Sequence, residues 1–192
     1  MGNFLSIDGI SPFASSEITK YLCDNLSYIY QNNIPIIFLC IGSDRSTGDS
    51  LGPLVGYKLN SFNKFQSNNI YIYGSLESPI HSLNIEETLN KINSNFKDSY
   101  IIAIDSCLGS VHDIGKIFID NIPLHPGLGI NKSLPPVGNI SIKGIVNISG
   151  TLEFIMLQNT RLYTVMALAD SIAEGIKHFI KKVSANNFYV DK

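Results

Sequence analysis

The segment 35–57 constrains the fold most, because a strand, a polar loop and a helix follow one another within it. The compact apolar run Ile36–Ile41 is typical of a strand that is buried on both faces. Gly42 ends the run, and a polar loop with two aspartates extends to Ser50. Pro53 fits the first turn of a helix, where its missing N–H leaves no hydrogen bond unmade. This order of elements predicts an α/β sheet with polar residues at the carboxyl ends of its strands.

The polar loop does not match the common nucleotide-binding motifs. A phosphate-binding P-loop needs a lysine after its last glycine, but Asp49 follows Gly48 here, and an acid would repel a phosphate. The glycine-rich dinucleotide fingerprint is absent as well. Asp49 or Ser50 can instead cap the following helix by accepting hydrogen bonds from its free N–H groups. Spacing alone leaves a helix cap and a catalytic site as equal alternatives.

Length and composition indicate one globular domain over residues 1–192, with loosely ordered ends at 1–13 and 184–192. Hydrophobic residues make up 44% and charged residues 16% of the 192 residues, which excludes a disordered chain. The net charge of −2 provides no basic surface for nucleic acid. No apolar run approaches the ~18 residues of a membrane span, and no signal segment is visible at the amino terminus. We therefore expect a soluble, intracellular protein with neither nucleic acid nor membrane as a partner.

The three cysteines, Cys23, Cys40 and Cys107, form no C-x-x-C pair. This number and spacing argue against a disulfide framework and against a structural zinc site. Cys107 follows Asp105 by two residues, but no Cys–His arrangement that would activate a thiolate is visible. We interpret Cys107 as a structural residue.

Helices and strands alternate along most of the chain. Helices are predicted over 14–32, 51–62, 82–96 and 151–183, and strands over 36–41, 70–73, 100–104, 115–119 and 140–148. Only a loop rich in proline and glycine joins the last two strands, so we expect them to be antiparallel additions. Thr151 is expected to cap the last helix, and the apolar residues on one face of this helix, from Leu152 to Phe179, should pack along the sheet. The predicted fold is a three-layer α/β/α sandwich around a mostly parallel sheet.

Two aspartates stand out because each follows a predicted strand. Asp49 lies in the turn after the first strand, and Asp105 ends the third. The ends of neighbouring parallel strands meet in one crevice, so the two carboxyl groups can lie close together. Two such acids do not ionise together easily, and a water between them can attack an amide carbonyl. A turn residue at the strand end remains the alternative for Asp105.

Four segments of the chain resemble the YyaC family of sporulation proteins, which are described as spore proteases. They are 41–53, 103–109, 123–129 and 157–162, and the resemblance covers roughly 34–180. More distantly, the pattern is similar to the germination protease of spores and to hydrogenase maturation proteases. The resemblance implies the α/β/α fold of those relatives.

The germination protease supplies one aspartate from each of the motifs T-P-D-A-L-G-P and I-D-A-L. The matching positions in this sequence are Asp49 and Asp105. The resemblance therefore implies an endopeptidase that acts on a polypeptide during sporulation or germination, in the cytoplasm of the forespore or mother cell. A non-catalytic protein that binds a peptide or partner on the same fold is the alternative.

Further residues complete the expected site. Asp44 and Arg45 of the polar loop are candidates for substrate binding, and Gly127 and Gly129 are candidates for the rim that holds an extended peptide. The sequence is compatible with a homo-oligomer but does not specify one.

Hydrogenase maturation proteases hold nickel with two acids and a histidine. No histidine of this chain falls in a matching motif, so no cofactor is expected. If a divalent metal is bound, Asp49 and Asp105 would hold it together with His81 or Glu77.

Overall fold

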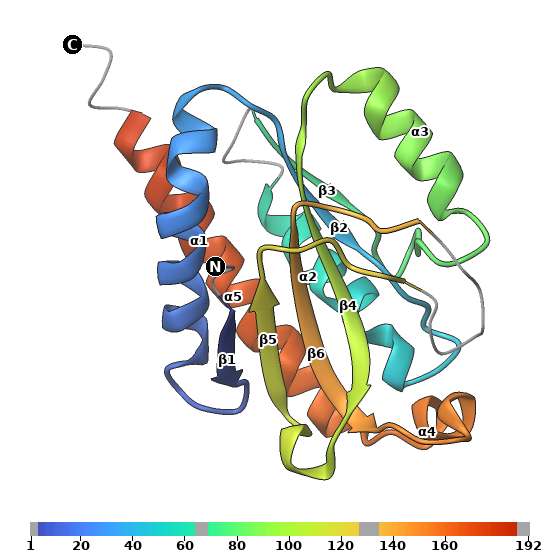
Figure 1. Cartoon of the computed structure of the whole chain (residues 1–192). Coiled ribbons are helices and arrows are strands. Elements are labelled where there is room, and N and C mark those ends of the chain that lie inside the picture. Colours follow the sequence, from blue (N-terminus) through green and yellow to red (C-terminus); the bar gives the residue numbers. More distant parts are fainter. Residues whose placement is uncertain (1–3, 64–68, 127–134, 188–192) are drawn as a thin grey trace.

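The computed structural model describes residues 4–63, 69–126 and 135–187, in which helices pack on a six-stranded sheet (Figure 1). The strands lie in the order β1-β5-β6-β4-β2-β3. Their bounds are β1 Leu5–Asp8, β2 Ile36–Cys40, β3 Ile70–Tyr73, β4 Tyr100–Gly109, β5 Lys116–Asp120 and β6 Ile140–Ile148. The helices are α1 Ala14–Gln31, α2 Leu51–Asn63, α3 Ile85–Asn95, α4 Glu153–Gln158 and α5 Leu162–Asn187.

The sheet is mixed, with its parallel strands grouped together. β2 pairs in parallel with β3 and β4, and β4 pairs in parallel with β6. β5 is antiparallel to both β6 and β1. The expectation that β6 is antiparallel to the parallel group is therefore wrong. β6 lies between β4 and β5, where it is antiparallel to β5 and runs in the same direction as β4.

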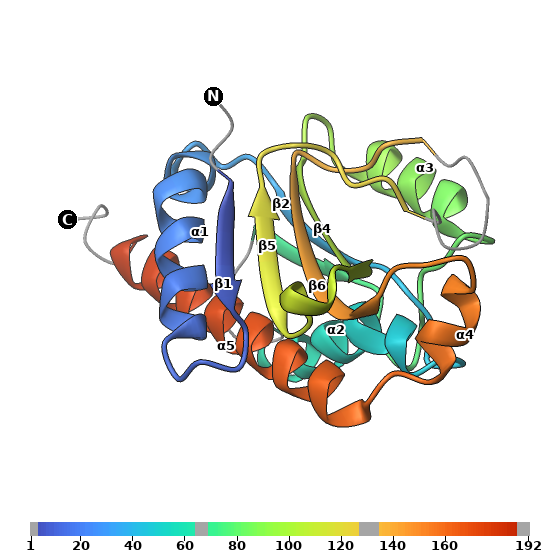
Figure 2. The same ribbon diagram turned by 60° about the horizontal axis from the view of Figure 1, so that its bottom comes forward.

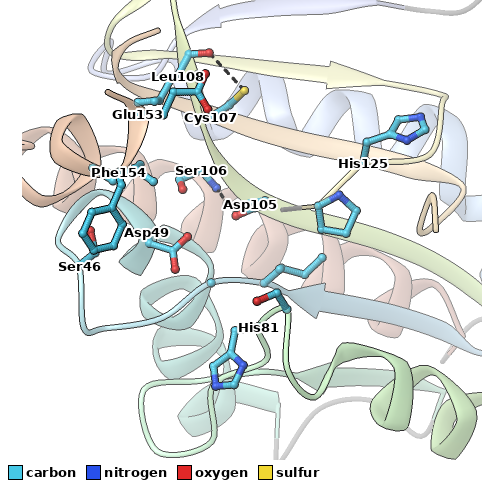
Figure 3. A pocket seen from close by; sticks show the side chains of 15 residues that line it. Ser46, Asp49, His81, Asp105, Ser106, Cys107, Leu108, His125, Glu153 and Phe154 are labelled. Atoms are coloured by element: carbon cyan, nitrogen blue, oxygen red, sulfur yellow. Dashed lines mark hydrogen bonds between the residues drawn. The ribbon is translucent and has the colours of Figure 1, made fainter. Parts of the chain in front are cut away.

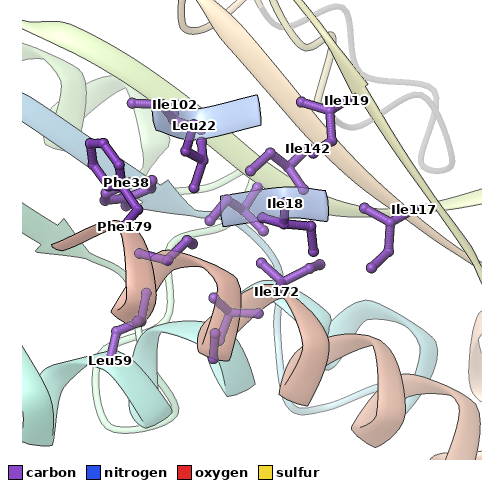
Figure 4. Close-up of a cluster of buried hydrophobic side chains, with 14 of the residues drawn as sticks. Ile18, Leu22, Phe38, Leu59, Ile102, Ile117, Ile119, Ile142, Ile172 and Phe179 are labelled. Atoms are coloured by element: carbon purple, nitrogen blue, oxygen red, sulfur yellow. The ribbon is translucent and has the colours of Figure 1, made fainter. Parts of the chain in front are cut away.

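The two faces of the sheet belong to two separate apolar cores. Alternate residues of a strand point to opposite faces, so Ile36, Phe38 and Cys40 of β2 join a large core with α1, α2 and α5. Figure 4 shows this core, in which the rings of Phe38 and Phe179 are 6.5 Å apart. Ile37 and Leu39 join a smaller core with α3 on the other face. Figure 2 shows α3 separated from α1 and α5 by the sheet, which confirms the predicted α/β/α layers.

None of the helices in the described residues has the length and apolarity that crossing a membrane requires.

Within the described residues, both end segments contain regular structure that the sequence did not predict. β1 lies within the segment 1–13, where it pairs with β5 and buries Ile7 to 1% exposure. The Ser171 hydroxyl donates to the carbonyl of Gly9 at 2.7 Å, which ties this end to α5. α5 continues to Asn187, beyond the predicted end at 183. A short strand with one buried side chain has too little periodicity to be recognised before its partner strand is known.

The predicted long helix over 151–183 is two helices. α4 ends at Gln158, and α5 begins at Leu162. The side chain of Asn147 in β6 donates to the carbonyl of Met156 at 2.9 Å and to Thr160 Oγ1 at 3.3 Å, which holds the break. Because the axis changes here, the apolar residues at the start do not reach the sheet: Leu152 and Tyr163 are 57% and 62% exposed. Thr151 does not cap either helix, since the residue before α4 is Leu152.

Candidate active site

A cavity of about 300 Å³ lies where β2 ends beside β4 (Figure 3). Its lining comes from the loop after β2, from the turn before α3, from four consecutive residues of β4, from His125 and Pro126 after β5, and from α4. Asp49 and Asp105 are both lining residues, so the structure brings together the two aspartates that the sequence singles out.

The loop after β2 fixes the backbone of Asp49. Gly42 has a φ of +135°, where side chains are strongly disfavoured, and a Cβ at this position would overlap the carbonyl oxygen of Asp49. The N–H of Ser43 donates to the same carbonyl at 3.0 Å. Asp49 lies in a short 3-10 helix, Gly48–Ser50, which continues directly into α2. Its side chain is thereby left to face the cavity (Figure 3).

Asp105 lies inside β4 rather than at its end, which corrects the predicted strand 100–104. β4 continues to Gly109 because it remains paired with β6, with Asp105 opposite Lys143. The N–H of Ser106 donates to Oδ1 of Asp105 at 2.7 Å and orients the carboxyl group. Figure 3 shows the carboxyl groups of Asp49 and Asp105 facing one another.

The surroundings of the two aspartates favour their neutral forms. Burial raises the pKa of Asp49 from 3.8 to about 6, although a hydrogen bond from the backbone of Ser43 opposes the rise. Burial raises the pKa of Asp105 well above 3.8, and the negative charge of Asp49 adds to this rise while the N–H of Ser106 opposes it. Asp105 keeps some accessible surface because it lines the cavity, but protein encloses its carboxyl group elsewhere.

The two pKa shifts divide the chemical roles. Asp105 is the more deeply enclosed and also faces the charge of Asp49, so Asp49 ionises first as pH rises and a proton shared by the pair lies mainly on Asp105. An ionised carboxylate can accept a proton from water, and a neutral carboxyl group can donate one. The cavity therefore holds a base and an acid within reach of the same small molecule.

The other residues predicted to bind substrate lie elsewhere. Asp44 and Arg45 are exposed, and neither is among the described lining residues of the cavity. Gly127 and Gly129 lie outside the residues that the structure describes. The role of all four in substrate binding stays a prediction.

The predicted metal ligands do not gather around the two aspartates. His81 lines the cavity, but its ring points away from them (Figure 3), and its Nδ1 accepts a hydrogen bond from the N–H of Leu83 at 3.3 Å. Glu77 is exposed. Across the described ranges, no three His, Cys, Asp or Glu side chains are placed to hold a metal ion together. As placed, these residues do not fit the expected three-ligand set.

One wall of the cavity comes from a helix that sequence reasoning assigned to the core. α4 contributes Glu153, Phe154 and Leu157 to the lining, and Phe154 is 58% exposed. The signal that would have located this wall is Asn159, because an asparagine often ends a helix. With a helix end at that position, the preceding residues no longer have to face the sheet.

Cys107 also lines the cavity, but its surroundings do not activate it. Burial raises the pKa of its thiol, and the charge of Asp105 adds to the rise while Lys143 opposes it. Its Sγ donates weakly to the carbonyl of Leu108 at 3.4 Å. A thiol that stays protonated at neutral pH is a poor nucleophile, in agreement with a structural role.

Comparison with known proteins places the chain among relatives without an assigned activity. A family model described as "Protein of unknown function (DUF1256)" matches residues 9–175. The "Uncharacterized protein YyaC" of Bacillus subtilis (strain 168) is 49% identical over 142 residues, which are 74% of this chain and 68% of that protein.

A solved structure shares the fold. The crystal structure of the NiFe hydrogenase maturation protease HycI from Thermococcus kodakarensis KOD1 matches with a TM-score of 0.55 and 18% identity. The match covers 81% of this chain and 98% of that one. At this identity, the likeness confirms the predicted type of fold and nothing finer.

Proposed function

The chain belongs to the DUF1256 family and is a relative of YyaC, and on that premise we propose that it is an endopeptidase in which Asp49 and Asp105 activate a water molecule. The observation that carries the proposal is the pair of carboxyl groups, from two separate elements, that line one cavity and both have raised pKa values. The polypeptide substrate, the timing in sporulation or germination and the cytoplasmic location of the enzyme belong to the same proposal. They are supported by the sequence motifs shared with sporulation proteins.

The proposed reaction gives the two aspartates different roles: Asp49 accepts and later returns a proton, and Asp105 stabilises charge without releasing its proton. Ionised Asp49 accepts a proton from water while the water oxygen bonds to the carbonyl carbon of the substrate. Neutral Asp105 hydrogen-bonds to the carbonyl oxygen and stabilises the charge that develops there. As the C–N bond breaks, the proton held by Asp49 passes to the leaving amine. Asp49 is ionised again, Asp105 has kept its proton, and no covalent enzyme intermediate has formed.

The test compares three variants with the wild-type chain. Asp49→Asn and Asp105→Asn should each lower the hydrolysis of an unfolded protein by about 10²–10⁴-fold, because the first removes the base and the second replaces the acidic hydrogen-bond donor with a weaker one. Asp120→Asn is the matched control, since Asp120 is an aspartate at the end of β5 that does not line the cavity. New amino termini, counted by mass spectrometry, measure the cleavage.

Three outcomes decide between the alternatives. Equal cleavage by the wild type and by both cavity variants would contradict the proposal. Binding of the unfolded protein without new termini, even with the wild-type chain, would favour a non-catalytic binding protein. Loss of cleavage in a chelator, with recovery after a divalent metal is added, would favour a metal-dependent enzyme.

A further inference from the structure

β4 extends beyond the end of β2 (Figure 1), and the residues in this extension line the cavity. Its first half pairs with β2 on one side, and this pairing ends where Ile104 lies opposite Cys40. One more hydrogen bond, from the N–H of Ile41 to the carbonyl of Ile104, closes that ladder at 2.8 Å. From Asp105 to Gly109, in the part of the chain that the structure describes, β4 is paired with β6 alone. One edge of this half-strand is therefore left without a neighbouring strand.

The direction of the backbone groups along β4 follows from their hydrogen bonds. The carbonyls of Ile101 and Gly109 accept from Asn139 and Ser149 on the β6 side, whereas the carbonyl of Ile104 faces β2. The backbone N–H and C=O groups of successive residues alternate in direction along a strand. Those of Ser106 and Leu108 therefore point to the β2 side.

Part of this edge is already occupied by side chains. The N–H of Ser106 donates to Oδ1 of Asp105, and the carbonyl of Leu108 accepts a weak hydrogen bond from Sγ of Cys107. The carbonyl of Ser106 and the N–H of Leu108 have no backbone partner within the described residues. These two groups are the pair that a neighbouring strand would use.

The cavity lies against this edge. Asp105, Ser106, Cys107 and Leu108 all line it, although alternate side chains of a strand point to opposite faces. A cavity that touches four consecutive residues must therefore lie beside the strand rather than above one face of it. It extends from the free edge of β4 to the carboxyl group of Asp49.

We propose that the substrate binds as an added strand on this edge of β4, with its backbone bonded to the carbonyl of Ser106 and the N–H of Leu108. This inference rests on the proposed function and names the class of substrate, an extended and unfolded polypeptide segment. The ladder ends at Asp105, because its carboxyl group already takes the N–H of Ser106. The next peptide bond of the substrate then lies beside the two aspartates, since successive residues of a strand are only about 3.3 Å apart.

Strand addition explains how a chain of this size selects its substrate. Backbone hydrogen bonds give affinity to any extended segment, while pockets for alternate side chains add selectivity. A folded protein keeps its backbone groups in its own helices and sheets and cannot pair with β4. The enzyme therefore discriminates between unfolded and folded forms of one sequence.

The experiment separates binding from hydrolysis by using the Asp49→Asn chain. Reduced, carboxymethylated lysozyme is the unfolded probe, and native lysozyme is the folded form of the same sequence. The unfolded form should bind, and the native form should not. A second substitution, Leu108→Pro, should weaken that binding at least roughly tenfold relative to Leu108→Ala, which loses the same side chain but keeps the N–H. Because the N–H of Leu108 lies outside the ladder with β6, proline is compatible with β4.

Hydrogen exchange of the Leu108 amide, measured by NMR on the Asp49→Asn chain, tests the same bond without any change in β4. The exchange of this amide should slow when the unfolded probe binds. Equal binding by the two Leu108 variants, unchanged exchange of the amide in the bound state, or no binding of the probe would overturn the inference. Cleavage by the wild-type chain without protection of Leu108 would leave the peptidase intact and remove strand addition. Protection of the Leu108 amide without cleavage by the wild-type chain would support strand addition and contradict the peptidase.

Discussion

The two halves of β4 differ in pairing, composition and use. Tyr100–Ile104 pairs with β2, Ile102–Ile104 pairs with β6 as well, and these last three residues are fully buried in the two cores. Asp105–Gly109 is paired on one side only and lines the cavity with an acid, a hydroxyl and a thiol. The change occurs at the residue where β2 ends. Chemistry can therefore begin within a continuous strand, at the point where one neighbouring strand is missing.

Burial has opposite consequences in the two halves. Burying apolar side chains in the first half stabilises the fold by about 25 cal/mol for each Å² removed from water. In the second half, burial disfavours the charged form of Asp105 and keeps a proton on it. The same enclosure therefore adds stability at Ile104 and prepares an acid one residue later.

The largest effect on stability is expected in the first half. Ile104→Ala removes a side chain with 0% exposure and should lower the free energy of unfolding by about 2–5 kcal/mol. Ile148→Ala is the matched control, because Ile148 lies at the end of β6 and is 39% exposed. Urea denaturation of both variants measures the difference. Equal losses would mean that the fold does not depend on the buried half of the strand.

A smaller effect on stability comes from pH and originates in the cavity. The raised pKa values mean that the folded chain keeps protons that the unfolded chain releases, so the contribution of this pair to stability is fully present below about pH 4 and is lost as pH rises through 6. The shift of Asp49 from 3.8 to about 6 alone corresponds to roughly 3 kcal/mol. Urea denaturation at pH 4.5 and pH 8 should show the fall, and the double variant Asp49→Asn, Asp105→Asn should be nearly insensitive. A double variant that keeps the full slope would assign the effect to other groups.

The rate of hydrolysis should depend on pH through the same groups. Protonation of Asp49 removes the base, so kcat/KM should fall roughly tenfold between pH 7 and pH 5. At high pH the rate should fall again as Asp105 loses its proton. A pH profile on an unfolded protein substrate checks both limbs, and a flat acid limb would remove Asp49 as the base.

The smallest effect is expected for the thiol in the second half. Cys107→Ser should lower hydrolysis by no more than about threefold, because burial keeps the thiol protonated and unreactive. Treatment of the wild-type chain with iodoacetamide should likewise leave most of the activity if the cavity is occupied by a peptide during the reaction. A loss comparable to that of Asp105→Asn would make Cys107 the nucleophile.

The sequence predicts the first half of β4 and misses the second for a physical reason. Tyr100–Ile104 is an apolar run, and such runs form strands wherever they are buried. Asp105–Gly109 has no apolar run, and it is a strand only because β6 pairs with it. The pairing of segments far apart in the sequence cannot be predicted from the local composition of either segment.

The candidate site was likewise predicted in part: the two aspartates were found, and the wall formed by α4 was missed. Asp49 and Asp105 could be selected because each follows a strand, and the resemblance to the YyaC family, confirmed by comparison, picks the same two positions. The α4 wall was missed because its apolar residues continue the stripe of α5 across the break. Whether Phe154 faces the sheet or the cavity depends on the hydrogen bonds of Asn147, and these link residues far apart in the sequence.

The contact between α4 and Gly48 bears on how this chain can diverge. α4 has no buried residue, so most substitutions along it cost the fold little. Gly48 is the exception in this contact, because a Cβ there would lie 2.8 Å from the backbone of Leu157 and 2.7 Å from Thr160 Oγ1, one residue before Asp49. Descendants of this sequence can therefore acquire new substrate preferences by changing the exposed side chains of α4. The glycine beneath the helix has to be inherited unchanged for the aspartate to keep its place.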